Sequence, residues 1–126
     1  MISELLLNEI KELQTDGYVI EYEEKNDGLI YLKFFHYSLP PIYKKSETTL
    51  LLKIPISYPN GNPDMFWTET ALEFKDGSYP KEGISQENIN ETNWTRFSWH
   101  LKKWNPGKDS LKTYIEFVNY RLNQKK

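Results

Sequence analysis

The sequence predicts an α+β fold in which helices at the two ends of the chain pack on an antiparallel sheet. Apolar residues recur at the spacing of an amphipathic helix near both ends, and they alternate with polar residues in segments between them. A further segment in the middle is more continuously apolar, which is typical of a central strand. Because helices outside a meander indicate α+β architecture, we expect this class. The 126 residues fit one domain over residues 1–126.

The first predicted helix covers residues 2–14. Asp16 and Gly17 supply its end, since glycine adopts the left-handed conformation that closes many helices. A first strand is expected over residues 18–24, where Tyr18, Ile20 and Tyr22 share one face. The helix is predicted from apolar residues at helical spacing, which are Ile2, Leu5, Leu6, Ile10 and Leu13.

Three more strands complete the predicted meander. Residues 25–28, with the sequence KNDG, predict a hairpin turn because Asn, Asp and Gly tolerate positive φ. The second strand covers residues 29–38, and the third covers residues 48–56 at the centre of the sheet. A short fourth strand is expected over residues 71–75.

The last third of the chain divides into an irregular segment and a closing helix. Residues 78–106 show no clear period, and long irregular segments in compact domains are usually functional or mobile. The closing helix begins after Asp109 or Ser110 as its N-cap. Its apolar face is formed by Leu111, Ile115, Val118 and Leu122. The predicted order is therefore N-terminal helix, four-stranded antiparallel meander, long irregular segment and C-terminal helix.

Composition excludes several functional classes. The chain has no cysteine, which excludes disulfides, thiolate metal sites and thioester chemistry through a cysteine of its own. His36, expected as a core or edge histidine of a strand, and His100 are the two histidines, so we expect no zinc site and no cofactor. A net charge of −2 does not favour nucleic acid. No apolar run approaches the roughly 20 residues of a membrane helix, and no basic leader is present, so we expect a cytoplasmic protein without a membrane partner.

Two motifs carry a resemblance to a known family. The first is YPNGNPDMFW at residues 58–67, where prolines end a strand and form a rigid turn. The second is WNPGKDSL at residues 104–111, which follows WTRFSWH at residues 94–100 and precedes the closing helix. In their order and spacing they resemble the prokaryotic ubiquitin-conjugating-enzyme-like (E2-type, UBC-like) family E, from the third strand onward.

The resemblance implies a UBC-like fold and a set of partners. These are a ubiquitin-like or multi-ubiquitin-like protein, an adenylating activating-enzyme-like protein, and a metal-dependent deconjugating peptidase, in a bacterial modification pathway. The superfamily pattern also implies a catalytic cysteine shortly before Trp104, at about Arg96, but no cysteine stands there. The His-Pro-Asn of the pattern is absent too, and Asn88 or Asn90 lies near the place of its Asn in surroundings that do not match.

Ser98 and His100 lie in the segment where the cysteine is missing, and two interpretations remain open. In the chemical one, either residue takes part in acyl transfer, because a hydroxyl can carry an oxyester when an imidazole acts as base. Asp109 is then a candidate to orient the imidazole. In the structural one, Ser98 caps a turn and His100 donates to a backbone carbonyl beside the tryptophans. Side chains two apart on an extended stretch point the same way without necessarily bonding.

Binding residues are expected around the same segment. Aromatic side chains are enriched at binding hot spots, although at least two of the three tryptophans here are expected to pack the segment against the core. The candidate binding residues are Trp94, Arg96, Trp99, Trp104 and Asp109. Two functional hypotheses follow: a cysteine-less E2-like protein that binds or transfers a ubiquitin-like protein, or a non-enzymatic interaction module with an unrelated α+β fold.

Overall fold

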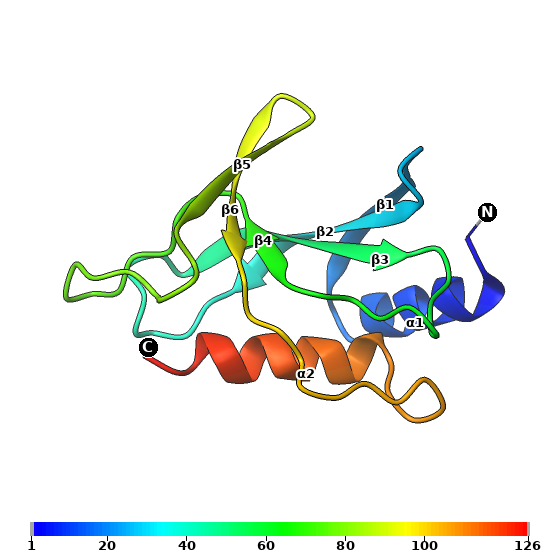
Figure 1. The fold of residues 1–126 in the computed structure, drawn as a ribbon. Coiled ribbons are helices and arrows are strands. Elements are labelled where there is room, and N and C mark those ends of the chain that lie inside the picture. Colours follow the sequence, from blue (N-terminus) through cyan, green and yellow to red (C-terminus); the bar gives the residue numbers. More distant parts are fainter. Residues whose placement is uncertain (1, 126) are drawn as a thin grey trace.

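The computed structural model of the chain describes residues 2–125, so Met1 and Lys126, the ends of the predicted domain, lie outside the described residues. It has an N-terminal helix, an antiparallel sheet and a C-terminal helix, which confirms the α+β prediction (Figure 1). The sheet order is β1-β2-β3-β4-β6-β5. The elements are α1 (Glu4–Thr15), β1 (Val19–Glu24), β2 (Leu29–Ser38), β3 (Glu47–Pro55), β4 (Phe66–Thr68), β5 (Ser85–Ile89), β6 (Thr92–Phe97) and α2 (Leu111–Leu122).

Local sequence signals place both helices. The Ser3 hydroxyl caps α1 by accepting from the Leu6 N–H at 3.2 Å, and Gly17, with a φ of +109°, turns the chain away. Of the two N-caps predicted for α2, Ser110 is the one observed, in a capping box with Thr113. Every residue of the predicted apolar face of α2 is buried.

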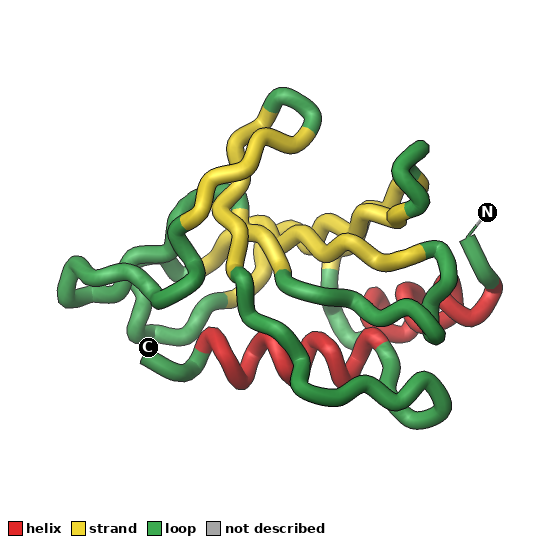
Figure 2. The backbone as a smooth tube through the Cα atoms, in the orientation of Figure 1, coloured by secondary structure: helices red, strands yellow, loops and turns green. Residues whose placement is uncertain are grey.

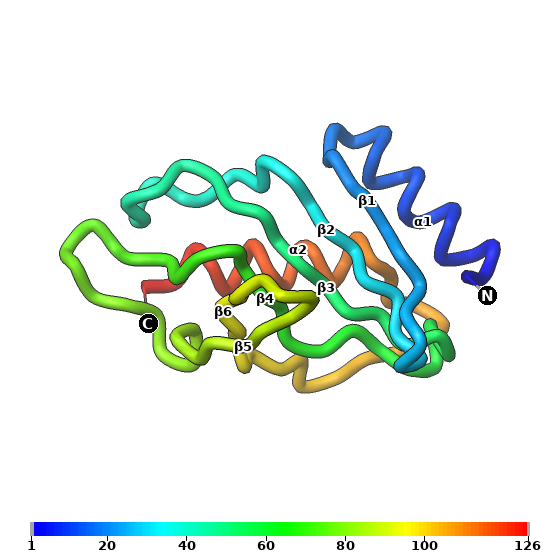
Figure 3. The backbone as a smooth tube through the Cα atoms, turned by 90° about the horizontal axis from the view of Figure 1, so that it is seen from above, coloured from blue at the N-terminus to red at the C-terminus, as the bar shows by residue number. Residues whose placement is uncertain are grey.

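The main core lies between α2 and the sheet. Figure 3 shows α2 running behind the strands and α1 lying beside β1. β3 is central, as predicted, and alternate residues of it, Leu50, Leu52 and Ile54, are completely buried in this core. Leu51 is equally buried but belongs to a second cluster on the opposite face of the sheet. Burial on both faces explains why the β3 sequence is continuously apolar.

The predicted fourth strand is wrong in position, and the sheet has six strands instead of four. The strand after β3 is β4, only three residues long, whereas residues 71–75 contribute one isolated bridge between Phe74 and Tyr43. Leu72 and Phe74 are buried and alternate with half-buried residues because this loop packs on the core, not because it joins the sheet. Three residues between a proline turn and a loop are too few to show a period in the sequence.

The predicted irregular segment contains a β-hairpin. Strands β5 and β6 are joined by Asn90 and Glu91, whose φ values of 51° and 67° form a two-residue turn with both residues in the left-handed region. The hairpin rises from the sheet on the side away from α2 (Figure 1). The sequence did not predict it, because β5 is polar and the turn has glutamate where glycine is usual.

Contacts among Glu87, Lys53 and Trp67, here called the Glu87 cluster, hold this hairpin on the outer face of the sheet, which is the face opposite α2. The Glu87 carboxylate accepts from Lys53 at 3.0 Å and from the Trp67 indole at 3.3 Å, and the Lys53 ammonium lies 4.2 Å from the Trp67 ring centre. Burial acts to raise the pKa of Glu87, but the hydrogen bonds from Lys53 and Trp67 outweigh it and hold that pKa below its usual range. The second apolar cluster lies beneath the Glu87 cluster and comprises Leu51, Trp67, Ile89 and Trp94.

Candidate functional site

The candidate site lies where two long connections meet. One is the proline-rich passage from β3 to β4, and the other is the connection from β6 to α2, which runs along α2 (Figure 2). The Trp104 indole N–H donates to the Pro59 carbonyl at 2.8 Å and ties the two connections together. A second tie joins them to α1, because a Glu9 carboxylate oxygen accepts from both the Tyr58 hydroxyl and the Leu111 N–H. The YPNGNPDMFW motif at residues 58–67 and the WNPGKDSL motif at residues 104–111 are therefore in direct contact.

His100 and Asp64 form a pair across the two connections. The His100 Nδ1 lies 2.8 Å from an Asp64 carboxylate oxygen, and the two side chains are 58% and 50% exposed. A carboxylate only accepts, so Nδ1 carries the proton in this contact and Nε2 is the other ring nitrogen. The orienting carboxylate is therefore Asp64 and not Asp109, whose own carboxylate accepts from the Asn105 N–H at 2.8 Å.

The backbone beside Asp64 is held in an unusual conformation. Met65 has a φ of +60°, a left-handed value that costs a residue with a side chain about 1–2 kcal/mol. The Tyr114 hydroxyl of α2 donates to the Met65 carbonyl at 2.5 Å. Burial raises the pKa of Tyr114 well above its usual value, with a smaller contribution from the Asp64 charge, so the hydroxyl stays protonated as a donor.

Ser98 is half-buried and is anchored through its backbone. Its N–H donates to the Glu82 carbonyl at 2.8 Å. Phe97 and Trp99 on either side are buried, which places Ser98 and His100 together on the other side of this extended segment. Within residues 2–125, no hydrogen bond joins the Ser98 hydroxyl to His100. The structural interpretation of His100 also differs from the geometry, since its partner is a carboxylate and not a backbone carbonyl.

The three tryptophans fix the position of the segment. Trp94 and Trp99 are 4% and 5% exposed, which confirms that at least two of them pack against the interior. The Trp99 indole donates to the Lys81 carbonyl at 2.8 Å, and the Arg121 guanidinium lies 4.7 Å from the Trp99 ring centre. Trp104 is half-buried and so leaves part of its surface open beside the proline-rich turn.

The remaining sequence candidates lie away from His100. Arg96 lies within β6, where its guanidinium is 3.5 Å from Glu87 on the outer face. Asn88 donates to Asn93 across the hairpin at 3.4 Å, and Asn90 lies in the hairpin turn. Neither asparagine is hydrogen-bonded to residues 98–100 in the part of the chain that the structure describes, so the sequence placement of an oxyanion-stabilising asparagine gains no support.

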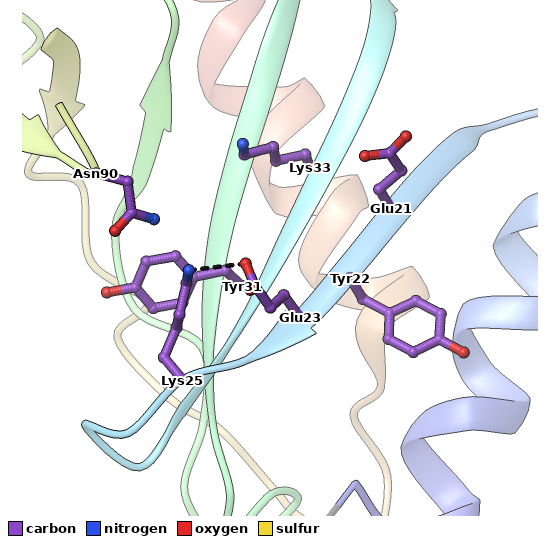
Figure 4. Close-up of a pocket in the computed structure, with 7 residues that line it drawn as sticks. All are labelled: Glu21, Tyr22, Glu23, Lys25, Tyr31, Lys33 and Asn90. Carbon is purple, nitrogen blue, oxygen red and sulfur yellow. Dashed lines mark ion pairs between the residues drawn. The ribbon is translucent and has the colours of Figure 1, made fainter. Parts of the chain in front are cut away.

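A separate cavity of about 350 Å³ lies on the outer face of the sheet (Figure 4). Its charges largely offset each other, with a Lys25–Glu23 ion pair of 2.7 Å that lowers the pKa of Glu23. Burial and the neighbouring Asp27 raise the pKa of Tyr31 to about 12. The cavity shares no residue with the His100 segment; it is lined by Glu21, Tyr22, Glu23, Lys25, Tyr31, Lys33 and Asn90.

Asp64, Met65 and Tyr114 are the residues at this site that the sequence did not predict. Asp64 follows Pro63 within the quoted proline-rich motif, but nothing in its local pattern connects it with His100. Over residues 2–125, no group of three or more histidines and carboxylates could hold a metal ion. No helix in the same range is long and apolar enough to cross a membrane.

The sequence profile of prokaryotic E2 family E matches residues 5–125, nearly the whole chain. No curated protein and no solved structure shows a significant match.

Proposed function

Because the chain belongs to prokaryotic E2 family E, we propose that it binds a ubiquitin-like protein and presents the tail of that protein at the segment around His100. The match covers nearly the whole chain and supports an E2-like role in bacterial ubiquitin-like modification. The partners that follow are a ubiquitin-like or multi-ubiquitin-like protein and an adenylating, activating-enzyme-like protein. A cytoplasmic location is part of the same proposal.

One observation carries the position of the site. His100 is exposed and held by Asp64 in the segment where the family resemblance places the missing cysteine. Trp104 is half-buried in the same connection and anchored to Pro59, so its indole offers a fixed surface for a peptide tail.

Acyl transfer through the chain is the second candidate function, and the His100–Asp64 pair favours it. Imidazole is a nucleophile and a base near neutral pH, and a carboxylate on one ring nitrogen fixes which nitrogen is available. Ser98 remains a candidate acyl carrier on the same side of the segment. An adaptor that only presents the ubiquitin-like protein is the alternative within the same role.

The test is a reconstituted reaction of the purified chain with a ubiquitin-like protein, its activating-enzyme-like protein and ATP. The products are separated with and without hydroxylamine, for the wild type, Ser98→Ala, His100→Ala and the control His36→Ala. A hydroxylamine-sensitive adduct that Ser98→Ala removes indicates an oxyester, and one that only His100→Ala removes indicates an acyl-imidazole. Binding without any adduct supports the adaptor.

A binding measurement can also contradict the proposal. Absence of binding to the ubiquitin-like protein and to the activating-enzyme-like protein would overturn the proposal. The chain would then be an interaction module whose partners lie outside ubiquitin-like modification.

A further inference from the structure

We propose that Asp64 is the positioning residue of a histidine-based acyl-transfer site, in which the His100 Nε2 and not the Ser98 hydroxyl is the reacting atom. The substrate class is an activated acyl group, a thioester carried by the activating-enzyme-like partner. This inference rests on the proposed function, because it concerns the same segment, but its geometry stands by itself.

The contact with Asp64 orients the His100 ring. The 2.8 Å contact between His100 Nδ1 and the Asp64 carboxylate uses one ring nitrogen. Because the carboxylate accepts, the neutral ring carries its proton on Nδ1 and its lone pair on Nε2. The ring is 58% exposed, which leaves room for an incoming carbonyl group. The Asp64 carboxylate thus selects the tautomer in which Nε2 can attack.

The backbone next to Asp64 is held in place from α2. The adjacent Met65 adopts a φ of +60°, and the Tyr114 hydroxyl holds its carbonyl from α2. Unfavoured backbone conformations of this kind persist only where the surrounding structure enforces them, and they cluster at functional sites. Tyr114 is completely buried, so this support is as rigid as the core itself.

The contacts of Ser98 differ from those of His100. Its hydroxyl makes no hydrogen bond to the imidazole within residues 2–125, and the His100 nitrogen that has a partner is directed at Asp64. A base that activates a serine nucleophile lies within hydrogen-bond reach of it, about 2.6–3.2 Å and often somewhat farther before substrate binds. The geometry therefore assigns the acyl-carrying role to His100, with Ser98 as a neighbour.

The acyl group passes from the donor thioester to the His100 ring and then to a substrate amine. The Nε2 lone pair forms a bond to the thioester carbonyl carbon, the carbon–sulfur bond breaks, and the donor thiolate leaves with the electron pair. The acylated ring is then positively charged, and the Asp64 carboxylate offsets that charge through the Nδ1 proton. A substrate amine next attacks the carbonyl carbon, the carbon–Nε2 bond breaks, the lone pair returns to Nε2, and the amine releases a proton to water.

The experiment compares Asp64→Asn with the wild type in two measurements that need no partner protein. Long-range ¹H–¹⁵N NMR of the neutral imidazoles reports which nitrogen of each ring carries the proton. The rate of acylation by diethyl pyrocarbonate, followed by peptide mass spectrometry, reports the nucleophilicity of each ring. His36 is an internal reference in both, and Glu47→Gln is the matched control because Glu47 lies 3.0 Å from the His36 Nδ1.

We expect His100 to carry its proton on Nδ1 in the wild type and to lose this preference in Asp64→Asn. Its acylation rate should fall about tenfold in the variant, the lower end of the 10–100-fold effects of carboxylates that orient metal-binding histidines. Glu47→Gln should leave both His100 signals unchanged. Asp64→Ala repeats the test with no amide at the position, and amide spectra check that each variant is folded.

Two results overturn the inference: an unchanged His100 tautomer in both Asp64 variants, or an unchanged acylation rate in both. The outcome is separable from that of the proposed function. If the tautomer and the rate respond to Asp64 but the reconstituted pathway forms no adduct, the positioning role stands and acyl transfer to a ubiquitin-like protein fails. If an adduct forms on His100 equally well in Asp64→Asn, transfer stands and the positioning role fails.

Discussion

The two histidines of the chain have the same local chemistry in different surroundings. The His36 Nδ1 lies 3.0 Å from Glu47, and the His100 Nδ1 lies 2.8 Å from Asp64. Both pairs are at least half exposed. His36 lies in β2, and its partner begins β3, the neighbouring strand. His100 lies in a connection, and its partner lies 36 positions away in another connection.

A histidine–carboxylate contact becomes a candidate site through the structure that supports it. His36 has a φ of 56° in the irregularity where the β2–β3 register shifts, so its conformation is explained by a bulge in the ladder. Asp64 lies beside a left-handed residue that a buried tyrosine holds from α2, and no ladder requires that geometry. An exposed ion pair contributes little by itself, so the supporting structure is what distinguishes the two.

The largest expected effect separates the two histidines in the reconstituted reaction. His100→Ala should lower adduct formation by about 100-fold or more, because acid–base groups contribute roughly 10²–10⁴-fold and a nucleophile more. His36→Ala should leave adduct formation unchanged. Initial rates of adduct formation from quantitative gels check both variants. Equal losses in the two variants would remove the functional distinction between the pairs.

The next effect concerns the support of Asp64. Tyr114→Phe removes the hydrogen bond to the Met65 carbonyl and should lower the free energy of unfolding by about 0.5–1.5 kcal/mol, because this partly buried bond is lost. It should also loosen the His100 tautomer preference without changing that of His36. Urea unfolding and imidazole NMR measure the two outcomes.

Tyr43→Phe is the matched control for that variant. The Tyr43 hydroxyl donates to the Leu122 carbonyl at 2.8 Å, a buried bond at the other end of α2. A similar loss of stability with an unchanged His100 tautomer is expected. If both variants loosen the tautomer equally, the effect is global destabilisation and not local support.

A smaller change in the free energy of unfolding is expected at His36. It tests whether the β-bulge alone explains the conformation of this residue. His36→Gly should raise the free energy of unfolding by about 0.5 kcal/mol, because relief of the left-handed strain exceeds the entropy cost of glycine. Thermal or urea unfolding measures the change. A loss of more than about 1 kcal/mol would show that the side chain of His36 stabilises the protein through contacts that its exposure does not indicate.

The smallest effect is expected at the partner of His36. Glu47→Gln removes an exposed contact and should change the free energy of unfolding by no more than about 0.5 kcal/mol. Adduct formation should be unaffected. Urea unfolding and the reconstituted reaction check this variant, and a clear loss of adduct would extend the functional site to the β2–β3 edge.

Elements with a local signal could be predicted from the sequence. Apolar faces placed both helices, Gly17 marked the end of α1, Ser110 was one of the two N-caps predicted for α2, and a continuously apolar run placed β3 at the centre. The β5–β6 hairpin was missed, because β5 is polar and the hairpin is held by Glu87 and the apolar cluster beneath it. β4 was displaced, because a strand of three residues has no period of its own.

The α+β class, the start of α2, the family resemblance and the segment in which a site was expected followed from the sequence alone. Only the tertiary structure decided which residues act together there. It paired His100 with Asp64 instead of Asp109, buried Trp94 and Trp99, and left Arg96 on the outer face. The reason is physical: caps and periodicities arise between residues a few positions apart, whereas Asp64, His100 and Tyr114 meet only after α2 packs beneath the sheet.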